Sequence, residues 1–132
     1  MVKEEGATGT VLVAEDEDAM RELLNDILDT GGYRVISVAD GEAAVRTFAE
    51  RKDEVDLVIL DMSMPKLNGS ETFRRLKAIN KDVRVLLSSG YNRDTWAQQL
   101  LEEGLAGFIG KPYQVGELLD KVGEIIYDRK RL

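Results

Sequence analysis

Three short apolar runs in this sequence each end in charged side chains. The first run is followed by Glu15 and Asp16, the second by Asp61 and the third by Lys111. Uninterrupted apolar runs of this length are typical of strands buried on both faces of a parallel sheet. The carboxyl ends of such strands are where open α/β sheets place their chemistry. Two acidic sites and one cation at three strand ends therefore predict a divalent-metal site suited to phosphoryl chemistry.

A plainer interpretation is that these acidic residues only cap the helices that follow. Asp16 and Asp18 are in place to cap the first helix, and this is common. Carboxylates clustered at one sheet edge, however, repel each other and cost stability unless a cation joins them. Hard oxygen ligands suit Mg²⁺, which keeps several waters in an octahedral shell. We favour a magnesium site over capping alone.

Lys111 and a pair of serines extend this candidate site. A lysine before a proline is usually a surface residue at a turn, but Lys111 follows an apolar strand that ends at the same edge as the carboxylates. It could pair with Asp61 or with an oxygen of a bound phosphoryl group, as a point charge. Ser88 and Ser89 could simply form a turn. The alternative is that one hydroxyl donates to a phosphoryl oxygen, and we favour Ser88 because it lies closer to the strand end.

The loop after Asp61 supplies fewer signals. Pro65 and Gly69 set turns, and a backbone carbonyl near Ser63 could complete a metal shell. The loop lacks the glycine-rich phosphate cradle of nucleotide-binding proteins, so nucleotide binding is unsupported. Ser63 and Gly90 are small, and we expect them to leave room for an attacking water molecule.

Composition narrows the function further. The chain has 132 residues, which suits one domain, and it has neither cysteine nor histidine. Thiolate metal sites, imidazole catalysis and a phosphohistidine on this chain are therefore excluded. The formal net charge of −7 disfavours binding to nucleic acid or to anionic membranes. With no span-length apolar stretch and no signal-peptide core, we expect a soluble cytoplasmic protein.

The rest of the sequence alternates between strand-like runs and helical stripes. The expected strands are Thr10–Ala14, Arg34–Val38, Asp56–Leu60, Val83–Leu87 and Ala106–Gly110. Apolar stripes at helical spacing follow them at Met20–Leu28, Ala44–Phe48, Phe73–Ile79, Trp96–Leu101 and Val115–Ile126. We expect Asp40 to cap the second helix, and Gly31-Gly32 and Gly104 to end the first and fourth.

Five βα units predict an α/β fold with a doubly wound, five-stranded parallel sheet, flavodoxin-like, in the order 2-1-3-4-5. Its switch point lies between the first and third strands, which carry the acidic residues. We expect residues 1–9 to be a disordered leader or an expression remnant, 10–128 to be the domain and 129–132 to be a frayed tail.

The charged and hydroxyl motifs described above, in their order along five βα units, resemble the CheY-like receiver domain of two-component response regulators. The resemblance extends from about Thr10 to Tyr127. The resemblance is carried by Glu15-Asp16, Asp61 with Pro65 and Gly69, Ser88, and Lys111-Pro112. It implies a phosphoprotein in which Asp61 accepts a phosphoryl group from a sensor histidine kinase or a phosphotransfer domain. It also implies that Asp16, Asp61 and the Ser63 carbonyl bind Mg²⁺, with Glu15 acting through a water.

The resemblance further implies that Lys111 contacts the phosphoryl group and that Ser88 and Phe108 hold the two switch positions. This chain has Glu15 where aspartate is commoner, Ser88 where threonine is commoner, and Phe108 where tyrosine is commoner. The switch would repack the surface of the fourth helix, the fifth strand and the fifth helix. Such a domain catalyses only its own phosphorylation and dephosphorylation, and a kinase or output domain is sometimes attached to it.

Two other functions fit parts of the pattern. A magnesium phosphatase of the haloacid-dehalogenase type also uses a strand-end aspartate, but it needs an acidic residue two positions on, where this chain has Ser63. A pure interaction module with a vestigial pocket is the second alternative, and the full set of acidic, hydroxyl and lysine residues argues against it.

Overall fold

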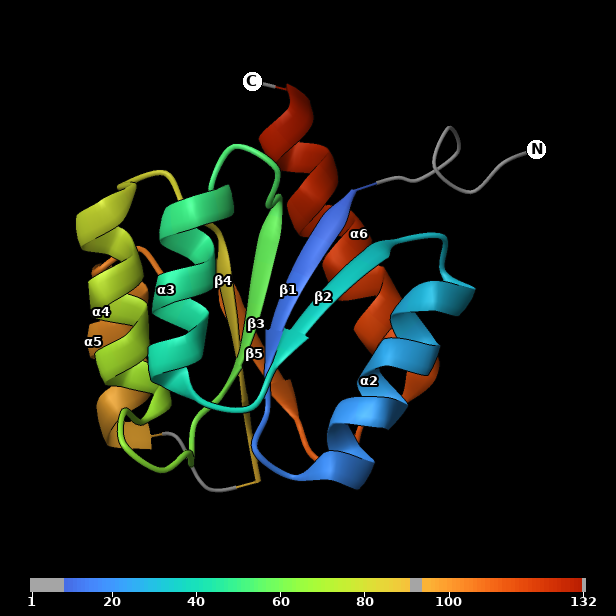
Figure 1. Cartoon of the computed structure of the whole chain (residues 1–132), viewed down its shortest axis with the longest axis horizontal. Coiled ribbons are helices and arrows are strands. Elements are labelled where there is room, and N and C mark those ends of the chain that lie inside the picture. The colour runs from blue at the N-terminus through green and yellow to red at the C-terminus, as the bar shows by residue number, and fades with distance from the viewer. Residues whose placement is uncertain (1–8, 91–93, 132) are drawn as a thin grey trace.

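Strands and helices alternate along the chain in this computed structural model (Figure 1). It describes residues 9–90 and 94–131, with the side chains of 94–96 and 128–131 left out. The strands are β1 (Thr10–Ala14), β2 (Arg34–Val38), β3 (Leu57–Asp61), β4 (Val85–Ser89) and β5 (Gly107–Gly110). The helices are α2 (Asp18–Thr30), α3 (Gly41–Arg51), α4 (Gly69–Ile79), α5 (Asp94–Glu102) and α6 (Val115–Arg131).

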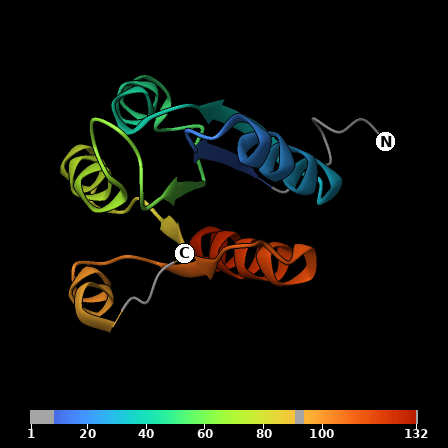
Figure 2. The ribbon, with the colours of Figure 1, turned by 90° about the horizontal axis from the view of Figure 1, so that it is seen from below.

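The sheet has the predicted order, β2-β1-β3-β4-β5, and all its neighbouring strands are parallel. Helices α2 and α6 cover one face, and α3, α4 and α5 cover the other (Figures 1 and 2). All carboxyl ends of the strands therefore point to one edge, which is the lower edge in Figure 1. The order of connection reverses between β1 and β3, so the two acidic strand ends are neighbours.

Two apolar cores, one on each face of the sheet, explain why the central strands read as continuous apolar runs. In β3, Val58 and Leu60 belong to the cluster beneath α3, α4 and α5, whereas Leu57 and Ile59 belong to the cluster beneath α2 and α6. Every residue of β1, β3 and β4 is buried. Alternate side chains thus enter opposite cores, and only the strand ends are available for polar side chains.

The predicted helix ends are largely confirmed. The Asp40 side chain accepts a hydrogen bond from Ala43 N at 2.7 Å and so caps α3. Gly31 follows the last residue of α2, and Gly104, with a φ of 103°, follows the end of α5. The capping box at α4, in which Asn68 and Glu71 bond to each other's backbone, was not predicted.

Several predicted boundaries were wrong by a few residues. β3 ends on Asp61 itself, and β4 runs from Val85 to Ser89 rather than ending at residue 87. β4 starts late because Val83 N still bonds to Asn80 O in the turn after α4. Gly9 is buried and its carbonyl accepts from Arg34 N, so it belongs to the fold rather than to a leader. Helix α6 continues through residues 129–131, which we expected to fray.

None of the described helices has the length and apolar character that a bilayer crossing requires.

Candidate functional site

The ends of β1 and β3 bring three carboxylates together. One carboxylate oxygen from each of Glu15, Asp16 and Asp61 lies within 4.8 Å of the others. Glu15 and Asp61 are 1% and 5% exposed, whereas Asp16 is open to solvent. The convergence predicted from the sequence is therefore present, and it combines two buried acids with one accessible acid.

Backbone amides help to orient the two buried carboxylates. Glu17 N donates to Glu15 Oε2 at 3.1 Å, and Ser63 N donates to Asp61 Oδ1 at 3.3 Å. Among the described residues, no side chain caps the start of α2, where Glu17 is the N-cap residue. Asp16 therefore does not serve as the helix cap that the plainer interpretation required.

Lys111 lies between the two buried acids. Its Nζ is 3.1 Å from Glu15 Oε1 and 3.1 Å from Asp61 Oδ1. Burial alone would lower the pKa of Lys111, but its bonds to the two carboxylates raise the pKa. Burial also raises the pKa of Glu15, and the nearby charge of Asp61 adds to that rise. One ammonium group is therefore shared by carboxylates that lack charge balance, and they favour a further cation.

The chemistry of this donor set fits Mg²⁺. Three carboxylates supply hard oxygen ligands, and the exposed Asp16 leaves one side open for retained waters. The two contacts to Asp61 made by Ser63 N and Lys111 Nζ are both to Oδ1. Among the described residues, Oδ2 is therefore the oxygen that these contacts leave available.

A cavity of about 290 Å³ opens beside Asp61, the one carboxylate of the cluster that lines it. Its lining comes from the ends of β3, β4 and β5, namely Asp61, Met62, Ser63, Ser89, Gly90 and Lys111. Ser63 is thus at the cavity as predicted, and the two small residues Ser63 and Gly90 both border it.

Of the two serines, the structure places Ser89 and not Ser88 at the cavity. Ser88 is fully buried within β4, where it pairs with Asp61 of β3, and its Oγ accepts a hydrogen bond from the Tyr113 hydroxyl at 2.8 Å. Ser89, one residue later, is the serine that lines the cavity. β4 extends further than predicted and includes both serines. Since successive residues of a strand point to opposite faces, only one of the two can face the cavity, and it is the second.

Phe108 lies in β5 opposite Leu87 and packs against the core beneath α3, α4 and α5. It is half-buried and is absent from the residues that line the described cavity. Its role as a switch stays a prediction.

Tyr113 is the site-adjacent residue that sequence reasoning missed. It follows the cis peptide between Lys111 and Pro112, is buried, and donates its hydroxyl to Ser88. Burial raises the pKa of Tyr113 to about 12, so the phenol keeps its proton at neutral pH. In the sequence, an aromatic residue just before a helix is indistinguishable from an ordinary core residue.

The loop from β3 to α4 closes tightly on the strand. Met62 N donates to Ser88 O, and Gly69 N donates to Met62 O, both at 2.9 Å. Between them, Lys66 has a φ of 72°, and Leu67 N donates across it to Pro65 O at 2.8 Å. This three-residue turn is rare and strained, and it returns the chain to the strand end.

Comparison with known proteins agrees with this site. The sequence model of the family described as "Response regulator receiver domain" matches residues 11–123. The chain belongs to this family. Receiver domains act in two-component signalling, and their family function is to accept a phosphoryl group.

Individual relatives cover very different lengths. Sporulation initiation phosphotransferase F of Bacillus subtilis (strain 168) is 31% identical over 112 residues, or 85% of this chain and 89% of that protein. Sensor kinase CckA of Brucella abortus (strain 2308) is 34% identical over 119 residues, which are 90% of this chain but 13% of the kinase. Among solved structures, a receiver domain protein from Clostridium thermocellum gives a TM-score of 0.88 at 27% identity, covering 92% of this chain and 97% of that one.

One structural relative bears on the metal. The receiver domain of sensor histidine kinase PA1611 from Pseudomonas aeruginosa PAO1 has a magnesium ion coordinated in its active-site cleft. It is 25% identical to this chain with a TM-score of 0.81, and the match covers 90% of this chain and 98% of that domain.

Proposed function

We propose that Asp61 is the phosphoacceptor of this receiver domain. The observation that carries the proposal is the position of the Asp61 carboxylate. It is buried but borders a cavity, and it is close to one lysine and two further carboxylates. An oxygen of Asp61 attacks the phosphorus of a phosphohistidine, the P–N bond breaks, and the imidazole nitrogen keeps the electron pair. The product is an aspartyl phosphate.

Electrostatics sets what the other residues do. The attack brings an anion to an anion, so positive charge near the phosphoryl oxygens lowers the barrier. Lys111 supplies one such charge. Asp16, Asp61, the Ser63 carbonyl and, through water, Glu15 would hold Mg²⁺, which when bound supports the charge on the equatorial oxygens. Ser89 takes the hydroxyl role that we had predicted for Ser88, because Ser89 borders the cavity.

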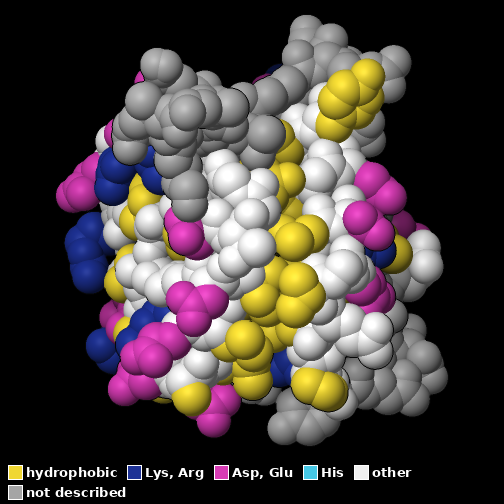
Figure 3. All heavy atoms as spheres, turned by 90° about the vertical axis from the view of Figure 1, so that its right-hand side faces the viewer, with side chains coloured by type: hydrophobic (Ala, Val, Ile, Leu, Met, Phe, Trp, Pro, Cys, Tyr) yellow, Lys and Arg dark blue, Asp and Glu magenta, His cyan; other side chains and the backbone are white. Residues whose placement is uncertain are grey.

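The phosphoryl donor must come from another chain or domain or from a small molecule, since no histidine is present. A sensor histidine kinase or a phosphotransfer domain is the partner that the family favours. Figure 3 shows apolar side chains gathered in a band on the face where α2 and α6 lie. Leu23 and Val115 of these helices are 42% and 50% exposed. This band suits a helical partner that brings its phosphohistidine to the adjacent cavity.

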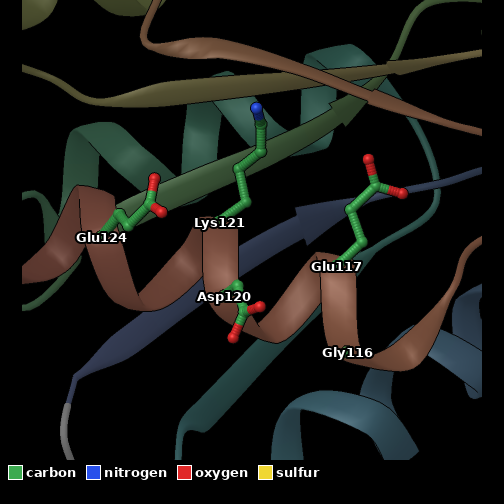
Figure 4. A pocket seen from close by; sticks show the side chains of 5 residues that line it. All are labelled: Gly116, Glu117, Asp120, Lys121 and Glu124. Atoms are coloured by element: carbon green, nitrogen blue, oxygen red, sulfur yellow. The ribbon is translucent and has the colours of Figure 1, made fainter.

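We further propose that phosphorylation repacks the surface formed by α5, β5 and α6. A phosphoryl group adds roughly −1.5 to −2 charge and strong acceptor oxygens. Ser89 donates to one of these oxygens, and Phe108 adjusts to the space beside it. Part of this surface is a hollow of about 460 Å³ along α6, where Glu117, Lys121 and Glu124 point to one side of the helix and Asp120 points away (Figure 4).

The lifetime of the aspartyl phosphate is set by access of water. Among the residues that the structure describes, a Cβ atom added to Gly90 would meet only Lys111 Cβ, at 4.0 Å, so these residues leave space on this side of the cavity. Together with Ser63 it leaves room for an attacking water. A measured half-life of many hours would contradict this.

Acetyl phosphate with Mg²⁺ tests the assignment directly, with intact mass spectrometry as the readout. We expect stoichiometric labelling of the wild type, none of Asp61→Asn, and normal labelling of the matched surface variant Asp120→Asn. Asp16→Asn should weaken Mg²⁺ binding several-fold in calorimetry. If Asp61→Asn is labelled at the wild-type rate, Asp61 is not the acceptor, and an unlabelled wild type would point to a vestigial pocket.

A further inference from the structure

The buried hydrogen bond between Tyr113 and Ser88 has no role in the mechanism above. The two residues are 9% and 0% exposed, lie 25 positions apart and are joined at 2.8 Å, and Tyr113 belongs to a core cluster of apolar and aromatic residues. Neither lines the cavity. Buried hydroxyl groups cost stability unless each is paired. Breaking this bond would leave both hydroxyl groups without it, so the folded protein favours keeping the bond formed.

The bond anchors the segment that carries Lys111. The backbone amide of Lys111 donates to Ser89 O at 3.3 Å, which is long for a backbone hydrogen bond. This bond lies just beyond the last residue pair of β4 and β5, Ser89 and Gly110. Two residues after Lys111, Tyr113 is fixed to Ser88 by the shorter side-chain bond. Both anchors are on β4, so the backbone of Lys111 is clamped against the strand next to β3.

Such a clamp matters because lysine is a long and flexible side chain. Its ammonium group must reach Glu15 and Asp61 together, at 3.1 Å from each. Four rotatable bonds separate that group from the backbone, so positional freedom at the backbone is passed on to the charge. A point charge that stabilises a transferring phosphoryl group is useful only when it is held in place beforehand.

We propose that Tyr113 is a positioning residue for Lys111, which fixes the lysine-bearing segment to β4 through its hydroxyl bond to Ser88. The inference rests on the proposed function, because it assigns a purpose to Lys111 in phosphoryl transfer. It adds two residues, one from β4 and one from the turn before α6, that act on the reaction without touching the cavity.

Loss of the hydrogen bond between Tyr113 and Ser88 should change two binding affinities differently, whereas a general loosening of the fold would weaken both. Lys111 pairs with Asp61 and Glu15, and so competes with Mg²⁺ for the same carboxylates. A less well-held lysine should therefore leave Mg²⁺ affinity unchanged or raise it. The same change should weaken binding of a phosphoryl mimic, which needs the lysine in place.

The experiment compares Tyr113→Phe, Ser88→Ala and the double variant with the wild type. Each is measured for Mg²⁺ affinity by calorimetry, for beryllofluoride affinity in saturating Mg²⁺, and for the rate of labelling by acetyl phosphate. Tyr33→Phe is the matched control, because Tyr33 is 8% exposed in the same core cluster as Tyr113 and its hydroxyl lies near Gly123 in the middle of α6. Thermal melts confirm that every variant is folded.

We expect each single variant to lose about three- to tenfold in labelling rate and in beryllofluoride affinity. The double variant should lose no more than either single one, because one bond is removed in all three. Mg²⁺ affinity should not fall, and Tyr33→Phe should match the wild type.

Three results would overturn the inference. These are wild-type behaviour of both single variants, an equal fall in Mg²⁺ and beryllofluoride affinity, or losses that add in the double variant. The proposed function fails separately: in that case the wild type itself takes up neither phosphoryl group nor beryllofluoride.

Discussion

The start of α4 approaches the end of β3 so closely that position 69 has room only for glycine. A Cβ atom on Gly69 would lie 2.7 Å from Leu87 Cδ2, 2.8 Å from the Asp61 carbonyl oxygen and 2.8 Å from Met62 Cα. The leucine methyl group can move, but the other two atoms belong to the backbone of Asp61, the proposed phosphoacceptor, and of its neighbour Met62. Gly69→Ala must therefore displace either the end of β3 or the first turn of α4.

The expected cost follows from these contacts. Forcing an extra carbon into a packed site costs about 1–3 kcal/mol. Alanine recovers little of this, because position 69 is the first helical residue, where the propensity gain over glycine is below the interior value of roughly 1 kcal/mol. We expect a net loss of about 1–2 kcal/mol, or roughly 3–8 °C in melting temperature for a domain of this size.

Urea denaturation followed by circular dichroism measures this loss, with Gly116→Ala as the matched control. Gly116 also lies in a first helical turn, and its added Cβ would have no atom of the described residues within 4 Å, so this variant should be as stable as the wild type or more so. The displacement also moves the Asp61 segment, so Gly69→Ala should bind Mg²⁺ more weakly in calorimetry. Equal stability and equal Mg²⁺ affinity in Gly69→Ala and Gly116→Ala would refute the close approach.

Three further predictions concern single contacts. With a chelator present to remove metal ions, Glu15→Gln should raise the free energy of unfolding at neutral pH. Burial and the charge of Asp61 raise the pKa of Glu15, which means that its charged form is unfavourable in the folded protein. The stability that comes with the raised pKa of Glu15 is fully present below its ordinary pKa of 4.5 and is lost as the pH rises through the raised value. The free energies of unfolding of the wild type and Glu15→Gln should therefore converge as the pH falls in an acid denaturation series, and a difference that persists in acid would contradict this. Asp40→Ala should cost about 1 kcal/mol in urea denaturation, because Ala43 N loses its cap, and a change below a few tenths would mean the cap contributes little. Lys66→Gly should stabilise the fold by up to about 1 kcal/mol, since relief of its positive φ outweighs its long ion pairs to Asp40 and Glu42; a lower melting temperature would reverse that ranking.

The fold is predictable because burial on both faces leaves a strong signal. Strands such as β1 and β3 must be apolar at their interior positions when each face meets a core, and the sequence shows this directly. The carboxylates can be placed for the same reason, since a charged residue that ends such a run can only lie at the sheet edge. The sequence pattern alone therefore locates Asp61 and Glu15 correctly.

The serine and tyrosine contacts were not predictable, because they depend on where a strand ends to within one residue. Ser88 and Ser89 are chemically identical, and only the register of β4 decides which of them faces the cavity. Tyr113 reads as an ordinary core aromatic, and its partner is 25 residues away. Neither spacing nor composition records such a pairing, since the fold alone brings the two hydroxyl groups together.

The charge arrangement explains why one lysine has to serve two purposes. Without a metal ion, Lys111 is the ammonium group that bridges the buried Glu15 and Asp61. In the proposed function, Lys111 could turn to a phosphoryl oxygen only when another cation takes over the charge of those acids, because leaving them unpaired and buried would cost several kcal/mol. Metal binding and use of the lysine are therefore coupled through the same carboxylates. In the proposed reaction, a phosphoryl group that arrived before the metal would meet a lysine still held by Glu15 and Asp61, so we expect phosphoryl transfer to require Mg²⁺.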